Sequence, residues 1–482
     1  MTEQQKLRIT EKFSYGLGDF ASCLYWQTIS VYLAIFYTDI FGISALAAGT
    51  MIGLSRSFDA IFDVVIGMLA DRTKSRWGKF RPYLLYTCVP MAVVGLLTFT
   101  VPDFSDKGKL IWAYVTFNSL MLIYTTINIP YTAMLGVITP NPVERTALSS
   151  IKFVGAFAGG IVISATLLPM AKVGGWLGAT SAKQGWQMSF VIIGIAAIIS
   201  FLIVFFNTRE RVLPPKAQQT SVLKDLGDLV TNRPWLVLLA TTITFIFFVA
   251  LRGNAIAHYF KYYVGTQTIT LPSWVPKIGG TQTWGWETLV SMFNTTNQVL
   301  SLIGAMLVPI LVRRVGSKPA FVILFVIAIL STAAFYFLQP EQLWLIFAVN
   351  AIGSITGGPL SAVLWAMYAD TADYAEWKTG RRATGLIFSA SIFSQKFGWG
   401  WGGGLSLVML NGVGFVANQV QTPEALHGLV KLMSIFPAAF GILAILILVI
   451  FYPLNEAKIE QISADLKARR AAAGDTPAGV GA

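Results

Sequence analysis

Two acidic residues, Asp59 and Asp63, lie four positions apart within a long apolar stretch at residues 43–70. A helix would place them on one face, about 6 Å apart along its axis, with Arg56 on the same face. Two carboxylates at this spacing predict a cation site. They can hold a cation between them, or one can be protonated because adjacent carboxylates do not both ionise readily in a low dielectric. A purely structural pair between Arg56 and an aspartate is the alternative interpretation.

A second group of polar and aromatic residues lies in the apolar stretch at 14–40. Asp19, Cys23, Trp26 and Gln27 follow one stripe of a helix. Polar groups on such a stripe suit the hydroxyl groups of a sugar, and an indole ring suits its flat apolar face. The stripe therefore predicts a sugar-binding surface, with packing as the alternative role for Trp26. Asp19, near one end of the stretch, is also a candidate gate residue.

Two further stretches supply candidates for the same surface. Tyr124, Asn128 and Thr132 share a helical face, and Lys152 begins the stretch at 148–170. We expect these side chains to reach one cavity. A lysine at the end of a stretch can instead extend toward the membrane surface, which is the alternative for Lys152.

A lysine near the middle of the stretch at 383–412, Lys396, is followed by Trp399. A charge at that depth normally has a partner or faces a wet cavity. Because its own stretch contains no acid, Asp59 or Asp63 is its expected partner. Trp399 is a further candidate for sugar contact.

Charged residues at the ends of apolar stretches predict gates between conformations. The candidates are Asp71, Arg72 and Arg76 after one stretch, and Asp370, Asp373, Glu376 and Arg382 after another. In the second group the acids repeat every three residues and oppose the arginine. We expect this group to act as a charge latch.

The composition explains where these residues must lie. The chain has 482 residues, of which 55% are hydrophobic and 12% charged, and its mean hydropathy is +0.64. Soluble domains carry roughly 25% charged residues, so the sequence predicts an all-α polytopic membrane protein rather than a soluble enzyme, a disulfide scaffold or a disordered chain. Only two histidines are present, with no phosphate loop or metal-ligand cluster, so we expect no enzyme activity and no cofactor.

Twelve apolar stretches are long enough to cross a bilayer, which takes roughly 20 residues each. They are 14–40, 43–70, 82–101, 110–137, 148–170, 187–206, 235–263, 288–312, 319–338, 342–369, 383–412 and 426–453. We expect a local helix break at Gly253, and an ordered loop or re-entrant cap at 265–287. The predicted domains are a six-helix bundle at 1–206, a cytoplasmic loop at 207–234, a second six-helix bundle at 235–453 and a cytoplasmic tail at 454–482.

The lysines and arginines predict the orientation. With the N-terminus inside, the inside segments hold 25 of the 35 basic residues. Such a bias places both termini in the cytoplasm. It also accounts for the net charge of +12, so no nucleic-acid partner is required.

The two halves also form a weak repeat. A short basic turn, rich in arginine and lysine, follows the second stretch at 71–82 and the eighth at 313–319. Two repeats with basic turns on one side are typical of transporters built from two bundles around a central path.

Several motifs together resemble the glycoside–pentoside–hexuronide:cation symporters of the major facilitator superfamily. They are residues 15–20, 36–42, 56–63, 71–82 and 370–376, together with Lys396. The resemblance implies a twelve-helix major facilitator fold that moves a glycoside with H⁺, Na⁺ or Li⁺. It also implies a cation site formed by Asp59, Asp63 and Thr125, with Lys396 nearby.

Departures from the family's type member, melibiose permease, affect which coupling ion and which sugar we expect. Phe62 replaces an asparagine of the cation site, which favours H⁺ over Na⁺. Cys23 and Asn128 replace two galactoside-binding aspartates, Thr132 replaces a tryptophan and Lys152 an arginine. A galactoside would therefore not be held in the same way, which leaves xylosides, glucosides or an acidic sugar.

The sequence thus predicts a monomeric symporter of the bacterial inner membrane, which couples glycoside transport to H⁺ or Na⁺. Its partners would be the glycoside and the lipid bilayer. A lysolipid transporter of the same fold and an uncoupled facilitator are the alternatives. A lysolipid transporter should show an apolar lateral cleft, and a facilitator would not need the charges of Asp59, Asp63 and Lys396.

Overall fold

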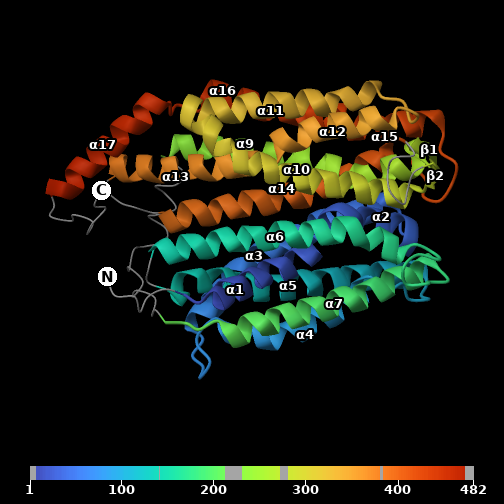
Figure 1. Ribbon diagram of the computed structural model, residues 1–482, viewed down its shortest axis with the longest axis horizontal. Helices are drawn as coiled ribbons and strands as arrows, with labels where there is room; N and C mark the ends of the chain where they lie inside the picture. The colour runs from blue at the N-terminus through green and yellow to red at the C-terminus, as the bar shows by residue number, and fades with distance from the viewer. Residues whose placement is uncertain (1–6, 140–141, 212–230, 272–279, 380–383, 473–482) are drawn as a thin grey trace.

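A computed structural model describes residues 7–139, 142–211, 231–271, 280–379 and 384–472. Two groups of long helices lie side by side, with both termini at one end of the molecule (Figure 1). The first group contains α1 (Ile9–Gln27), α2 (Leu33–Ile35), α3 (Ala45–Arg72), α4 (Arg81–Thr98), α5 (Asp106–Ile138), α6 (Pro142–Ala171) and α7 (Ala182–Asn207). We call this group the N-bundle.

We call the second group of long helices the C-bundle. It contains α9 (Arg233–His258), α10 (Trp286–Val315), α11 (Ser317–Ala334), α12 (Leu343–Gly357), α13 (Leu360–Thr379), α14 (Thr384–Gly412), α15 (Pro423–Met433) and α16 (Ile435–Phe451), and ends with α17 (Glu456–Ala472). A short 3₁₀ turn, Phe335–Phe337, follows α11. The predicted tail is thus partly helical.

Polar residues cap the first turns of several of these helices. Ser44, Ser105, Ser181, Asn232 and Thr422 each accept a hydrogen bond from a backbone N–H in the first turn of the helix that follows. Such caps satisfy backbone donors that have no partner within the helix. α9 continues through Gly253 to His258, so the helix break expected there is wrong.

Ten helical stretches in the described part of the chain are long and apolar enough to cross a membrane. α3 and α14 are not among them. Both nevertheless lie within the helix bundles in Figure 1. A multi-pass membrane protein is confirmed, and the count of twelve stays a prediction.

A β-hairpin departs from the expected all-α architecture. β1 (Gln267–Leu271) pairs antiparallel with β2 (Gly280–Trp284), with Gln267 opposite Trp284. The hairpin lies at the end of the molecule opposite the termini (Figure 1). The expected ordered loop is therefore a strand pair, which satisfies its backbone groups through cross-strand hydrogen bonds.

The first helix of each bundle changes its winding as it approaches the hairpin end. η2 (Thr28–Tyr32) and η3 (Phe36–Phe41) are π-helical in the N-bundle, and η4 (Tyr259–Val264) is π-helical in the C-bundle. η3 ends at Gly42 with φ 85°, and η4 ends at Gly265 with φ 68°. These left-handed positions favour glycine, so the two halves share this local structure.

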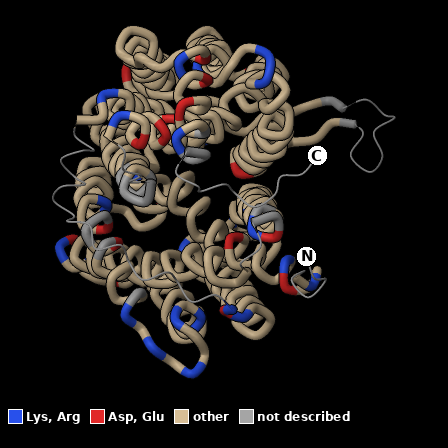
Figure 2. Tube along the Cα trace, turned by 90° about the vertical axis from the view of Figure 1, so that its left-hand side faces the viewer, with Lys and Arg blue, Asp and Glu red and all other residues tan. Residues whose placement is uncertain are grey.

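The weak sequence repeat corresponds to a pair of carboxylate caps at the end that holds the termini. Glu210 accepts three backbone hydrogen bonds of 2.8, 2.8 and 2.9 Å at the start of α4. Glu456 accepts one of 2.7 Å from the backbone N–H of Ser317 at the start of α11. Figure 2 looks onto this end and shows lysines and arginines on loops of both bundles.

A bidentate ion pair ties the same region of the N-bundle together. Arg211 contacts Glu11 at 2.7 and 2.9 Å. Hydrogen bonding to this carboxylate raises the pKa of Arg211. The pair joins the segment after α7 to the start of α1.

Candidate functional site

Lys396 bridges the two bundles near the middle of α14. Its Nζ atom lies 2.5 Å from Oδ1 of Asp63 and 3.2 Å from Oδ2 of Asp59. The hydroxyl of Thr125 lies 2.8 Å from Asp59 Oδ1 and 3.2 Å from Asp63 Oδ1. The expected partner of Lys396 is thus present, and all three residues of the implied cation site converge on one point.

A close crossing of α3 and α14 brings these charges together. A Cβ atom on Gly49 would lie 2.6 Å from the backbone oxygen of Gly404. A Cβ atom on Gly404 would likewise lie 2.6 Å from the backbone oxygen of Gly49. Only glycine permits such an approach, and small residues at helix crossings are common in membranes. Phe62 is 41% exposed on the outer side of α3 and supplies no ligand to the carboxylates.

The Arg56 side chain lies between this charged cluster and the interior of the protein. It is 4% exposed, and its guanidinium carbon is 4.8 Å from the centroid of the Trp26 ring. This geometry is a cation–π contact, which is stronger when water is excluded. With Asp59, Asp63 and Lys396, Arg56 completes a group of two negative and two positive charges.

A cavity of about 300 Å³ lies between the bundles and is the candidate substrate site. Small-molecule pockets range from roughly 300 to 1,000 Å³. Of the residues predicted to bind substrate, Trp26, Gln27 and Trp399 line it. The ring of Trp26 stands edge to face against that of Trp399, with centroids 5.9 Å apart.

The C-bundle contributes polar residues to the cavity that the sequence interpretation missed. They are Asn294, Asn297, Gln298 and Ser301 on α10, and Arg252 on α9. The four α10 residues follow the spacing i, i+3, i+4, i+7, which is one helical face. A polar stripe within the apolar stretch at 288–312 was the sequence signal that could have indicated these residues. Gln298 donates to Gln27 across the bundles at 3.0 Å.

The other predicted substrate residues form a separate cluster among α1, α5 and α6. Lys152 Nζ lies 3.9 Å from Asp19 Oδ1 and 3.3 Å from the Thr132 hydroxyl. Cys23 lies against α6 beside Gly159. These residues are not part of the cavity lining, and their contact with substrate stays a prediction.

Tyr124 and Asn128 connect this cluster to the cavity. The Asn128 side chain accepts from Ser22 at 2.7 Å and donates to the backbone oxygen of Tyr124 at 3.0 Å. The ring of Tyr124 stacks on Trp26 with centroids 6.0 Å apart. Asn128 thus uses hydrogen bonds within the N-bundle, and Tyr124 supports the cavity wall from behind.

The predicted gate residues lie at the end that holds the termini. Arg382 and the side chain of Asp71 fall outside the described residues. Arg76 lies over the ring of its neighbour Trp77 at 4.3 Å, and Arg72 is exposed. Asp370, Asp373 and Glu376 are half-buried on α13. Their gating role stays a prediction.

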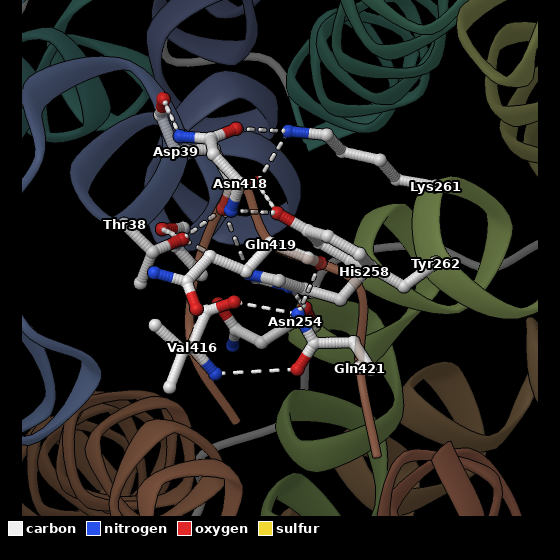
Figure 3. Close-up of polar contacts among 11 residues, drawn as sticks. Thr38, Asp39, Asn254, His258, Lys261, Tyr262, Val416, Asn418, Gln419 and Gln421 are labelled. Carbon is white, nitrogen blue, oxygen red and sulfur yellow. Dashed lines mark hydrogen bonds and ion pairs between the residues drawn. The ribbon is translucent and has the colours of Figure 1, made fainter. Parts of the chain in front are cut away.

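A polar network joins the two bundles at η3 and η4, the π-helical turns near the hairpin end, and Figure 3 shows its side chains. Asp39 of η3 accepts from Lys261 at 2.5 Å and from the hydroxyl of Tyr262, both on η4. Asn418 donates to the backbone oxygen of Asp39 at 2.7 Å. The side chain of Asp39 is fully buried. We call these four residues the hairpin-end lock, because they join the two bundles.

A histidine extends the lock. Nε2 of His258 lies 3.0 Å from the Thr38 hydroxyl, and Nδ1 lies 3.2 Å from the backbone oxygen of Asn254. The sequence analysis included Asp39 in a family motif but gave neither Asp39 nor Lys261 a role, although each is a charge inside an apolar stretch.

Curated relatives match this chain over nearly its whole length. It is 36% identical to the uncharacterized symporter YnaJ of Bacillus subtilis, over 96% of each chain. It is 33% identical to the inner membrane symporter YicJ of Escherichia coli, again over 96% of each. It is 35% identical to the isoprimeverose transporter of Lactiplantibacillus pentosus, over 96% of this chain and 92% of that protein.

The fold also matches solved transporter structures. A bacterial homologue of the human lysosomal transporter Spinster, inward-facing and occupied, aligns with a TM-score of 0.58 at 17% identity, over 95% of this chain and 96% of that one. The family described as MFS/sugar transport protein matches residues 14–276 and 280–456. The chain therefore belongs to the MFS/sugar transport protein family: it has the major facilitator fold and is a membrane transporter, not an enzyme.

Proposed function

We propose that this protein is a symporter that moves a glycoside together with H⁺ or Na⁺ by alternating access. The observation that carries the proposal is the contact of Lys396 with Asp59 and Asp63 across the two bundles. The names of its relatives support symport, and one of them is an isoprimeverose transporter.

The charged cluster provides a way to couple an ion to a change of access. Without a coupling ion, Lys396 and Arg56 balance the charges of the two aspartates, and the contacts of Lys396 hold α14 against α3. A proton or Na⁺ at the carboxylates competes with the lysine for them. Ion binding therefore weakens a contact between bundles, and the ion shifts the equilibrium by its different affinity for the two states.

The cavity favours a sugar over a lysolipid. Asn294, Asn297 and Gln298 offer donors and acceptors for hydroxyl groups, and Trp26 and Trp399 offer flat apolar faces. A lysolipid would need a continuous apolar cleft. An uncoupled facilitator would gain nothing from a buried ion cluster, whose burial is costly.

We further propose the orientation and the moving parts. The termini lie in the cytoplasm of a bacterial inner-membrane protein, the hairpin end faces outward, and residues 1–206 and 235–453 move against each other as a monomer. The hairpin-end lock and the contact between Gln27 and Gln298 then belong to a state closed toward the outside.

The test is uptake into proteoliposomes that carry an imposed pH or Na⁺ gradient, with radiolabelled isoprimeverose as the first probe. Asp59→Asn and Asp63→Asn should abolish uphill accumulation and preserve exchange of labelled for unlabelled sugar, because exchange does not require return of an empty carrier. Asp103→Asn, at an exposed position, is the matched control. Full accumulation in both single variants and in the double variant would refute coupling through this cluster.

A further inference from the structure

His258 is a fully buried histidine at the point where the first helix of the C-bundle meets the hairpin-end lock (Figure 3). Its Nδ1 atom lies 3.2 Å from the backbone oxygen of Asn254, which is an acceptor, so we place a hydrogen on Nδ1. Its Nε2 atom lies 3.0 Å from the hydroxyl of Thr38 and 3.6 Å from Oδ2 of Asp39. Thr38 and Asp39 belong to the N-bundle, so the imidazole lies at a contact between the bundles.

The charges around the imidazole balance when it is neutral. Its charged and titratable neighbours are Asp39 from η3, and Lys261 and Tyr262 from η4. Lys261 lies 2.5 Å from Oδ1 of Asp39, and Tyr262 donates to the same oxygen. The rings of Tyr262 and Phe415 lie beside the imidazole, with centroids 6.5 and 5.4 Å away. Among the described residues, Asp39 is the only carboxylate within 4 Å of His258, and Lys261 already compensates its charge.

A proton on His258 would add a positive charge that the closed lock does not compensate. The other charged pair at this end, Lys172 with Glu287, also sums to zero. The proton would gain a bond from Nε2 to the hydroxyl of Thr38, which lies 2.5 Å from Asp39 and can donate to it. A hydrogen bond with one charged partner contributes roughly 1.5–3 kcal/mol, whereas an uncompensated buried charge costs roughly 3–5 kcal/mol. The buried imidazole is therefore neutral while the lock is closed.

We propose that His258 is a proton-binding site of the transporter, separate from the charged cluster around Lys396, and that it takes up its proton when the hairpin end opens. This inference rests on the alternating access of the proposed function and adds to it a second site for a proton. Opening parts Asp39 from Lys261 and admits water to the imidazole. The imidazole then titrates as an ordinary histidine does, near pH 6.5, so acid favours the open state.

The sign and size of the effect follow from proton linkage. The closed state binds no proton at His258, whereas the open state binds one below about pH 6.5. The closed state therefore loses stability relative to the open state as the pH falls through this value. Below it, a single proton changes the ratio by up to about tenfold per pH unit. We expect the open-to-closed ratio to rise about tenfold between pH 7.5 and pH 5.5.

The distance between two spin labels across the hairpin end measures this ratio. Val173, after α6, and Val420, after α14, are 53% and 100% exposed. Both are replaced by cysteine in a chain whose two native cysteines, Cys23 and Cys88, are changed to alanine. The labelled full-length protein is placed in lipid nanodiscs without sugar, and double electron–electron resonance is recorded at pH 7.5 and pH 5.5. The longer distance reports the open state.

Histidine variants assign the response, because the chain has only two histidines. His258→Gln keeps a side chain that forms hydrogen bonds but does not titrate, so the ratio should no longer depend on pH. His427→Gln is the matched control: His427 is exposed on α15, 3.5 Å from the Tyr336 hydroxyl, and its loss should leave the tenfold response. Each measurement is repeated with Asn418→Gly, which removes a contact between the bundles and raises the open fraction. Glycine adopts the φ of 58° at this position without strain.

The outcomes separate this inference from the proposed function. An equal ratio at both pH values in the wild type and in Asn418→Gly, or a ratio that falls in acid, would overturn the proton site. A response that persists in His258→Gln, or that disappears equally in His427→Gln, would assign the proton to another group and also overturn it. None of these results contradicts coupled transport, which uptake into proteoliposomes tests separately. A single distance under every condition, including Asn418→Gly, would contradict the inference and the alternating access on which it rests.

Discussion

The hairpin-end lock predicts how the transporter responds when one buried carboxylate is neutralised. Asp39→Asn keeps the shape of the side chain and removes its charge. The variant side chain keeps one acceptor oxygen, but it no longer forms an ion pair with Lys261. If the hairpin end opens in the proposed alternating access, the contacts of the lock between the bundles must break, so we expect the variant to favour the state that is open at this end.

The size of the effect follows from burial and contact distance. Asp39 is fully buried, whereas Lys261 is 19% exposed and keeps a 2.8 Å contact with Asn418. Removing one partner of a buried pair costs roughly 3–5 kcal/mol. Because the Lys261 side chain remains partly exposed to solvent, we expect the closed state to lose about 3 kcal/mol relative to the open state. This loss corresponds to a change on the order of 100-fold in the closed-to-open equilibrium.

Thiol labelling in the cavity measures that equilibrium. Asn297→Cys places a thiol on the cavity wall, in a background where Cys23 and Cys88 are replaced by alanine. An impermeant maleimide is added from the hairpin side of proteoliposomes, and the initial labelling rate reports the open fraction. Asp39→Asn should raise this rate by about 100-fold, or to saturation if the open state becomes the major one.

Lys172→Gln is the matched control for the same assay. Lys172 also contacts an acid of the other bundle, Glu287, but at 3.9 Å and with 44% of its side chain exposed. Exposed pairs contribute roughly 0–1 kcal/mol, so labelling should change by less than about fivefold. Equal effects of Lys172→Gln and Asp39→Asn, or an unchanged rate in Asp39→Asn, would refute the lock.

Two other predictions concern the end that holds the termini. Glu210→Gln removes the charge that accepts three backbone hydrogen bonds at the start of α4, and it should lower stability by about 1–3 kcal/mol; an unchanged thermal midpoint of the purified protein would contradict this role. A thiol introduced by Glu460→Cys, on the exposed face of α17, should resist an impermeant maleimide on intact cells and react after permeabilisation. Labelling on intact cells would overturn the proposed orientation.

Much of the fold follows from the sequence because a membrane constrains composition. In the bilayer every backbone group must be satisfied within a helix or a closed barrel, so long apolar stretches predict helices. The exceptions have physical causes. The hairpin between η4 and α10 lies in a polar, tryptophan- and threonine-containing segment, where no apolar period indicates either structure. The π-helical turns before Gly42 and Gly265 keep the hydrophobic pattern of an ordinary helix, so the sequence does not reveal them.

The site was predictable to the extent that a charge in an apolar stretch requires a partner. That rule correctly places Lys396 beside Asp59 and Asp63. The same rule applied to Asp39 and Lys261 would have found the hairpin-end lock. Asn128 shows the limit of the method, because a polar face on α5 does not reveal that its amide already bonds to Ser22 and Tyr124. Only the packing of α1 on α5 decides that.

The Trp26 ring contacts both the charged cluster and the central cavity. The Arg56 guanidinium carbon lies 4.8 Å from its centroid, and the ring lines the cavity beside Trp399. In the proposed coupling, an ion that displaces Lys396 from the aspartates of α3 would change the charge balance around Arg56. Because a cation–π contact depends on that balance, we expect the position of Trp26 to depend on ion occupancy. Such coupling would need no long pathway, because one aromatic ring lies between the proposed ion site and the proposed sugar site.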